Sequence, residues 1–350
     1  MYPASPFDRR MRDNEGVAVQ DVPACPLCGA DGQDLYTGLR DRLWDAPGTW
    51  SLRVCPACGH VWLDPRPVPD AMAMLYGSYY THQPPPERPP SSAGLAARRA
   101  VLADLGYGDT NARREGPTLG RLLRLAGPYR ESFERHVRLV RGPPRGTLLD
   151  VGCGDGSFLA TMRALGWGVQ GLEPDPAAAA IARERHGIDV IERPIERLES
   201  PPDRCGAITM NHVIEHVHDP VRALEACRRA LIPGGQLVVV TPNVESQGHR
   251  TFGKAWFHLD PPRHFHLFRP GTLRSTAERA GLRIADVRTS ALGAMDVRRA
   301  SLVIRAHGRV DLRNPASPPS LRDRLFEWGE YTMTWAGRDA GEEILLTATK

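Results

Sequence analysis

Lysine is nearly absent from this sequence. Only Lys254 and Lys350 occur, so arginine supplies almost all of the 45 basic side chains, and with 34 Gly and 32 Pro this bias is typical of a GC-rich genome. No run of 18 apolar residues is found, and the N-terminal stretch MYPASPFDRRMRDNEG has no apolar centre. We therefore expect neither a membrane-spanning helix nor a secretion signal, and a cytoplasmic location.

Acidic and basic side chains are unevenly distributed along the chain. Residues 1–82 carry a net charge of −3, whereas residues 83–146 carry +6. A nucleic-acid-binding module is expected to show a basic footprint, and the N-terminal part lacks one. The charge pattern thus argues against nucleic acid as a partner.

The length of 350 residues fits one large α/β domain with a small additional module. The segment QPPPERPPSS at 83–92 is typical of an extended linker. We predict a cysteine module over 1–82, a Pro/Arg-rich linker over 83–117 and the main domain over 118–350.

In the main domain, apolar spacing predicts a helix over 118–141, kinked near Gly127 and ended by the prolines and glycine at 143–146. Strand-like and helix-like segments then alternate, which favours an α/β fold with a mostly parallel sheet and helices on both faces. The predicted strands are 147–151, 168–172, 189–192, 207–210, 236–241, 282–289 and 343–349, and the predicted helices are 157–165, 176–185, 221–231 and 272–280.

Two matching Cys-x-x-Cys-Gly knuckles lie in the N-terminal module. Cys25 and Cys28 form the first, Cys55 and Cys58 the second. Each knuckle can present two thiolates to one ion, and the following glycine allows a tight turn. The four cysteines predict a structural zinc site with no position open for substrate, although four buried or redox-active thiols are the alternative.

The segment LLDVGCGDGS at 148–157 places a glycine-rich turn between an apolar strand and a helix. Gly152, Gly154 and Gly156 allow close approach of the backbone to a ligand, and the helix N-terminus offers amides to a carboxylate. Ser157 stands where a dinucleotide fingerprint would have a third glycine. Glu173, at the end of the next strand, can accept hydrogen bonds from ribose hydroxyls.

This segment, the following GLEPDP, the MNHVIEHVHDP segment at 210–220 and the LIPGGQLVVVTPN segment at 231–243 resemble the ordered motifs of class I S-adenosylmethionine-dependent methyltransferases. The resemblance implies a Rossmann-like seven-stranded sheet, S-adenosylmethionine as cofactor and a closing strand at ILLTATK. It implies that the cofactor is bound by Asp150, Gly152, Cys153, Gly154, Asp155, Gly156, Glu173, Pro174, Ile195, Glu196, Asn211 and His212.

The N-terminal module, including DRLW at 41–44 and CPACGHVWLDPRP at 55–67, resembles the zinc ribbons of bacterial glycan and natural-product methyltransferases. This resemblance implies a small-molecule methyl acceptor, such as a glycan, sugar or natural-product intermediate, methylated at oxygen or carbon.

Seven of the twelve histidines fall between residues 212 and 266. We predict His264 as base or orienting group, with Arg263 and His258 beside it, because a histidine titrates near neutral pH. Packing or hydrogen bonding is the alternative for these histidines. His212, Glu215 and His216, spaced to share one side of a helical turn, could instead hold a second metal ion.

Two other functions remain open at this point. One is an RNA methyltransferase with a zinc knuckle, and the other is a zinc-ribbon scaffold that senses the cofactor without catalysis. The sequence predicts neither the acceptor nor the oligomeric state.

Overall fold

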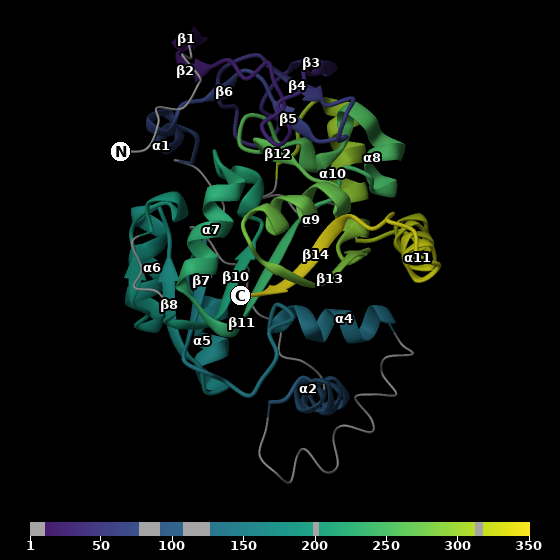
Figure 1. Ribbon diagram of the computed structural model, residues 1–350. Coiled ribbons are helices and arrows are strands. Elements are labelled where there is room, and N and C mark those ends of the chain that lie inside the picture. Colours follow the sequence, from purple (N-terminus) through teal and green to yellow (C-terminus); the bar gives the residue numbers. More distant parts are fainter. Residues whose placement is uncertain (1–10, 77–91, 108–126, 199–202, 312–317) are drawn as a thin grey trace.

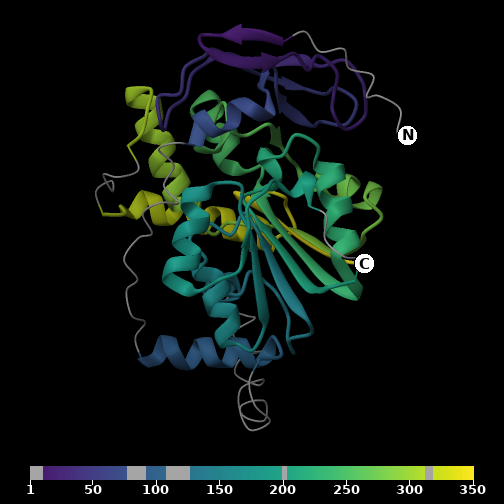
Figure 2. The same ribbon diagram turned by 90° about the vertical axis from the view of Figure 1, so that its left-hand side faces the viewer.

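The computed structural model describes residues 11–76, 92–107, 127–198, 203–311 and 318–350. A seven-stranded sheet forms the centre of the main domain, and the N-terminal strands lie beyond one end of it (Figure 1). Helix α2 (Ser92–Asp104) lies at the opposite end, as Figure 2 also shows.

The large sheet has the strand order β13-β14-β11-β10-β7-β8-β9. Strands β7 to β11 pair in parallel, and β14 enters antiparallel between β11 and β13. The strands are β7 (Thr147–Val151), β8 (Gly168–Leu172), β9 (Val190–Ile191), β10 (Cys205–Asn211), β11 (Leu231–Pro242), β13 (Arg283–Ser290) and β14 (Glu343–Thr349). The sheet is the Rossmann-like methyltransferase sheet that the resemblance implies.

Side chains alternate between the two faces of this sheet and fill two apolar cores. Leu149 and Ile208 face the core that contains α7 (Pro220–Ala230) and α9 (Pro270–Arg279). Leu148 and Ala207 face the core that contains α2, α5 (Ser157–Ala164) and α6 (Pro176–His186). Both faces of the sheet are therefore covered by helices, as the alternation of segments predicts.

The remaining helical elements flank the sheet or connect its strands. They are α4 (Gly127–His136), α8 (Gln247–Phe252), α10 (Ala294–His307) and α11 (Leu321–Trp335), with the short 3-10 turns η4 (Ile195–Arg197), η5 (Ile214–His216), η6 (Gly253–Ala255) and η7 (Phe257–Leu259). Among the described residues, no helix has the length and apolar character needed to cross a membrane.

The predicted helix over 118–141 is wrong at its end. Helix α4 stops at His136, because Arg138 and Leu139 have positive φ angles of 44° and 61°, which a helix does not accommodate. Residues 118–126 of that prediction lie outside the described residues.

Two small sheets form the N-terminal part. One is β1 (Met11–Asn14), β2 (Val17–Gln20) and β6 (Arg66–Pro67), followed by η1 (Pro69–Ala71) and α1 (Met72–Tyr76). The other joins β3 (Gln33–Leu39), β4 (Trp50–Val54) and β5 (Val61–Leu63) to β12 (His266–Leu267), so a strand from the main domain completes it.

The contact between the N-terminal part and the main domain is an apolar core. Trp50 and Leu52 pack in one cluster with Trp256 and Phe265, and all four are fully buried. At about 25 cal/mol per Å² of buried apolar surface, two tryptophans and a phenylalanine contribute several kcal/mol to this contact. The segment 256–268 thus lies between the two parts and belongs to both.

Candidate functional site

The glycine-rich turn lies at the carboxyl ends of the parallel strands. Gly152, Gly154 and Gly156 all have positive φ angles, of 69°, 54° and 79°. A Cβ on Gly152 would come within 2.5 Å of Val213 Cγ2, and one on Gly156 within 2.9 Å of Ala182 Cβ. Only glycine suits these positions. In open α/β sheets ligands bind at this edge, so the turn has the place and the backbone expected of a cofactor cradle.

Glu173 follows β8 and is buried against that turn. Its Oε2 accepts the Gly154 amide at 2.9 Å and its Oε1 accepts the Asp175 amide at 3.0 Å. Burial raises the pKa of Glu173, opposed by these two amides. A carboxylate has about four lone-pair positions, so each oxygen keeps capacity for one ribose hydroxyl.

Asp150, on β7 just before the turn, is fully buried. Its Oδ1 accepts the Thr209 hydroxyl at 2.7 Å and pairs with Arg138, whereas Oδ2 has no hydrogen-bond partner among the described residues. Burial raises the pKa of Asp150 to about 6, against the charge of Arg138. A buried acceptor without a partner marks a place where a ligand donor fits.

Arg138 was not predicted from the sequence. Its guanidinium lies 3.9 Å from the centre of the Phe158 ring and reaches Asp150 from a left-handed backbone position. No motif signals this residue, because its place depends on a strained turn that follows α4. It adds a cation to the methionine side of the predicted cofactor site.

The other predicted cofactor residues surround the same edge of the sheet. Cys153 is buried, with its thiol against Gly171, and Asp155 accepts the Ser157 amide at the start of α5. Ile195 is buried on η4 and Asn211 ends β10. Pro174 follows Glu173, and Glu196 accepts the His218 amide at 3.0 Å.

His212 lies just beyond β10, held between two buried carboxylates. Its Nε2 is 2.8 Å from Glu343 Oε1 and its Nδ1 is 3.2 Å from Glu215 Oε1. Burial lowers the pKa of His212, but the neighbouring carboxylates of Glu215 and Glu343 outweigh this effect and raise the pKa to about 10. His212 is therefore a cation near neutral pH.

The predicted acceptor-side residues lie beside this cluster. His264 is nearly buried, and its Nδ1 is 2.8 Å from the His258 carbonyl oxygen, so it donates there and leaves the lone pair on Nε2. The His258 side chain stacks 6.0 Å from His212, and burial, together with the charge of His212, lowers its pKa to about 3. His258 is therefore neutral and a weak base.

Arg263 is fully buried and enclosed by two carboxylates. Its Nη1 and Nη2 donate to Asp41 at 2.8 and 2.7 Å, and its Nε donates to Asp260 at 3.1 Å. Asp41 also accepts the amides of Leu43, Trp44 and Ala46. The guanidinium is thus engaged within the protein and joins the N-terminal part to the loop that carries His264.

The four knuckle cysteines converge on one point. Cys25 Sγ lies 3.7 Å from Cys58 Sγ, and Cys28 Sγ lies 3.4 Å from Cys55 Sγ. Tetrahedral zinc with bonds of about 2.3 Å requires sulfur–sulfur distances of about 3.8 Å. The Gly29 and Gly59 amides bond to Cys25 O and Cys55 O, both at 2.9 Å, so the two turns match. The thiols fit a closed four-sulfur zinc site.

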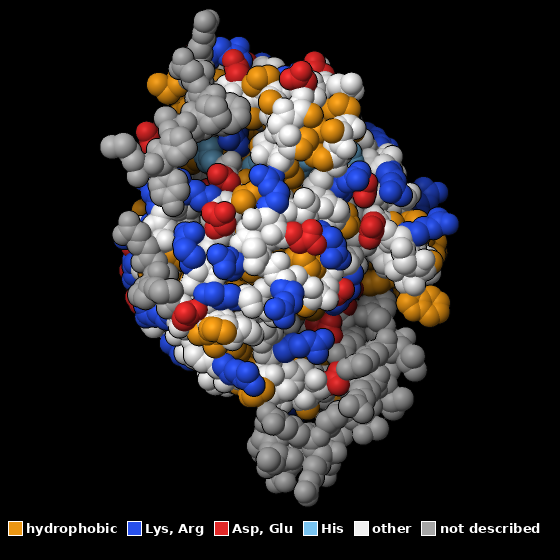
Figure 3. Space-filling model, in the orientation of Figure 1, with side chains coloured by type: hydrophobic (Ala, Val, Ile, Leu, Met, Phe, Trp, Pro, Cys, Tyr) orange, Lys and Arg blue, Asp and Glu red, His pale blue; other side chains and the backbone are white. Residues whose placement is uncertain are grey.

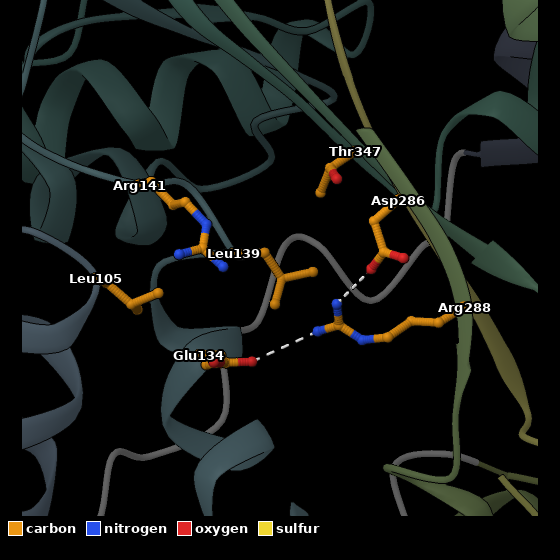
Figure 4. A pocket seen from close by; sticks show the side chains of 7 residues that line it. All are labelled: Leu105, Glu134, Leu139, Arg141, Asp286, Arg288 and Thr347. Carbon is orange, nitrogen blue, oxygen red and sulfur yellow. Dashed lines mark hydrogen bonds and ion pairs between the residues drawn. The ribbon is translucent and has the colours of Figure 1, made fainter. Parts of the chain in front are cut away.

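A separate small pocket lies between the α2–α4 region and strands β13 and β14 (Figure 4). Arg288 in its wall pairs with Asp286 at 2.7 Å and with Glu134 at 3.5 Å. None of its lining residues belongs to the predicted site. The charges of Arg288, Asp286 and Glu134 in this pocket are paired with one another.

Comparison with known proteins finds similarity to methyltransferases. Residues 123–287 match the family model described as a methyltransferase domain. The ubiquinone biosynthesis O-methyltransferase of Pseudomonas paraeruginosa is 32% identical over 153 residues, 40% of this chain and 66% of that protein. The enzyme of the same name from Pseudomonas entomophila is 33% identical over 152 residues, with the same coverage. The chain thus spans just under two thirds of these relatives.

Among solved structures, a possible histamine N-methyltransferase from Thermotoga maritima is similar at 20% identity and a TM-score of 0.41. The similarity covers 73% of this chain and 91% of that one.

Proposed function

We propose that the protein transfers a methyl group from S-adenosylmethionine to a hydroxyl oxygen of a small molecule. The match of residues 123–287 to a methyltransferase-domain family model and the similarity to O-methyltransferases support this proposal. The observation that carries this proposal is the pairing of the glycine turn with Glu173 at the edge of the sheet that also holds the histidine cluster. In this proposal the cofactor-binding residues and the acceptor-side residues lie together near the end of β10.

S-adenosylmethionine, when bound, supplies a methyl group on a positively charged sulfur. Gly152, Gly154 and Gly156 fit it because their backbone leaves the turn open to a ligand. Glu173 would accept the ribose hydroxyls, and Asp150 Oδ2 would accept a donor of the methionine part.

On the acceptor side we assign His264 as base or orienting group, since its Nε2 carries the lone pair. The enclosed guanidinium of Arg263 makes it a positioning residue, and His258 contributes its carbonyl oxygen rather than its imidazole. The four cysteines would hold a structural zinc ion, with no part in the transfer.

Surface charge supports a small acceptor over RNA. On the face shown in Figure 3, acidic and basic side chains are intermingled and form no continuous basic field. We retain the cytoplasmic location as part of this proposal, because closely spaced free thiols are typical of reducing compartments.

Isothermal titration of S-adenosylmethionine into the wild type and Glu173→Ala tests the cofactor site. Loss of two hydrogen bonds to a charged group is expected to weaken binding by about 3 kcal/mol, roughly 100-fold. Glu192→Ala is the matched control, since Glu192 is exposed and pairs with Arg183 at the surface. Equal affinity in all three proteins would refute the site.

Methyl transfer itself is tested with labelled cofactor and a panel of phenols, sugars and polyketide-like alcohols. A methylated hydroxyl supports the proposal. Tight cofactor binding with no product from any acceptor class would favour the non-catalytic scaffold.

A further inference from the structure

Three buried side chains beside the proposed methyl site form a cluster with ligand-type atoms. Glu215 and His216 come from η5, and His264 comes from the loop after η7. One ligand atom from each lies within 4.8 Å of those of the other two. The Phe265 amide donates to the Glu215 carbonyl oxygen at 2.7 Å, which fixes the two segments against each other.

Both imidazoles are oriented by the backbone. His216 Nδ1 lies 3.0 Å from the Arg263 carbonyl oxygen, and His264 Nδ1 lies 2.8 Å from the His258 carbonyl oxygen. Each Nδ1 therefore donates to a carbonyl oxygen, which makes Nε2 of each ring the atom that can bind a metal ion. Histidines that bind metals are held in this way, with the second nitrogen donating to a carbonyl or carboxylate. His264 Nε2 also lies 3.8 Å from Asp260 Oδ2.

The carboxylate of the cluster is incompletely satisfied. Glu215 is fully buried, and its Oε2 accepts the Thr241 hydroxyl at 2.9 Å. Its Oε1 faces His212 Nδ1 at 3.2 Å, but outside hydrogen-bonding geometry. The ion pair with His212 leaves this oxygen with lone-pair capacity that a metal ion can share.

His212 does not complete the set that the sequence suggests. Both of its ring nitrogens face carboxylates, those of Glu215 and Glu343, so neither is available as a ligand. His264, 48 positions after His216 in the sequence, takes the third place instead. The replacement of His212 by His264 in this cluster could be found only from the folded structure.

We propose that Glu215, His216 and His264 bind one divalent transition-metal ion, distinct from the four-cysteine zinc site. Two imidazoles and one carboxylate match the donor set of open zinc sites and also suit manganese, iron or cobalt. Three protein ligands leave a coordination position open, unlike four thiolates.

The role of this ion rests on the proposed function. An ion beside the methyl site can polarise an acceptor hydroxyl and so lower its pKa without a strongly basic side chain. If His264 binds the ion, it acts as the orienting group and not as the base. Metal binding itself does not depend on methyl transfer.

Metal content tests the proposal. Full-length protein, stripped with a chelator, loaded with zinc and desalted, is expected to hold two ions per chain by plasma mass spectrometry. His264→Ala and the nearly isosteric Glu215→Gln are each expected to hold one. The control His136→Ala, which removes an exposed histidine of α4, should keep two.

Cobalt loading separates the two sites, because only the four-cysteine site gives thiolate-to-metal charge-transfer absorption. The wild type should bind one cobalt ion without this absorption. That ion should be missing from Glu215→Gln and still bound by Cys28→Ser. A wild type that never binds cobalt or zinc outside the thiolate site overturns the proposal, whether or not the variants fold. A wild type that transfers methyl groups but binds no second ion would refute the metal site and leave the proposed function intact. A wild type that binds a second ion but methylates no acceptor would support the metal site and count against the proposed function.

Discussion

At the scale of single residues, two interior carboxyl groups have no cationic partner in the part of the chain that the structure describes. Glu330 on α11 and Glu342 just before β14 are both fully buried. Trp256 Nε1 donates to Glu342 at 2.9 Å, whereas neither Glu330 oxygen has a hydrogen-bond partner within the described ranges. Burial and the neighbouring Glu342 raise the pKa of Glu330 well above its ordinary value, and burial also raises the pKa of Glu342.

These shifts make the protein less stable as the pH rises. An acid whose pKa is raised on folding keeps its proton in the folded chain after the unfolded chain has lost it, so stability falls from about pH 4.5 upward. Glu330→Gln removes this penalty while keeping the shape of the side chain. We expect its melting temperature to exceed that of the wild type by a few degrees at pH 8.5, on the order of 1 kcal/mol, and by less at pH 5.

Differential scanning calorimetry at the two pH values measures this difference. Glu184→Gln, at an exposed position of α6, serves as control and should follow the wild type at both. A Glu330→Gln protein less stable than the wild type at pH 8.5 would show that the carboxyl pair stabilises the fold.

Residues with a local role could be predicted from the sequence, and those with a distant partner could not. The glycines of the turn and Glu173 follow a fixed spacing along two neighbouring strands, so their proximity is encoded locally. Arg263 was predicted to act beside His264, whereas its guanidinium is bound by Asp41, which lies 222 positions away. Nothing in the local sequence distinguishes an arginine enclosed by carboxylates from one that faces a substrate.

At the scale of elements, β12 and the loop before it connect the N-terminal zinc-ribbon-like part to the proposed acceptor side. Strand β12 pairs with β5 through His266 and Trp62, and Leu63 N donates to the Phe265 carbonyl oxygen at 3.0 Å. Asp41 holds Arg263 at the start of this segment. The ribbon side of the molecule thereby fixes the backbone on either side of His264.

Asp41→Asn is therefore expected to impair the acceptor step and leave the cofactor step unchanged. An amide can accept only one of the two guanidinium bonds, and its partner arginine stays buried, which costs about 2 kcal/mol or more. We expect kcat to fall at least 10-fold with unchanged S-adenosylmethionine affinity, measured by steady-state kinetics and titration.

Asp34→Asn is the matched control, since Asp34 is an exposed acid of the same ribbon, 3.7 Å from Arg53. Reduced cofactor affinity in Asp41→Asn would assign the residue a general structural role instead.

The strands and helices differ in how well their positions could be predicted from the sequence. Strands β7, β8 and β14 have the predicted bounds, because each is a short apolar run between turns. Strand β12 is two residues long and owes its existence to a partner some 200 positions earlier, so no local pattern indicates it. Helices α10 and α11 were not predicted, because arginines and exposed apolar residues obscure their periodicity.

At the scale of the whole molecule, the shared core predicts one cooperative unit. Trp50 and Leu52 of the ribbon pack with Trp256 and Phe265 of the main domain. Loss of the proposed zinc ion, by chelation or in Cys55→Ser, should therefore destabilise both parts together. We expect a single calorimetric transition shifted down by roughly 5 °C or more.

The control for this prediction is Cys205→Ser, a buried cysteine of β10 outside the knuckles, which should keep its zinc content. Two separate transitions after zinc removal would show that the ribbon unfolds alone and that the shared core is not cooperative.

Strand β14 lies between β11 and β13, although it follows both in the chain. During synthesis β13 therefore has no neighbour in the sheet until about 60 further residues, with α10 and α11, have left the ribosome. Until then the edges of β11 and β13 stay unpaired and able to join strands of other chains. The nascent protein is thus most prone to aggregate late in translation, after the proposed cofactor turn has already been made.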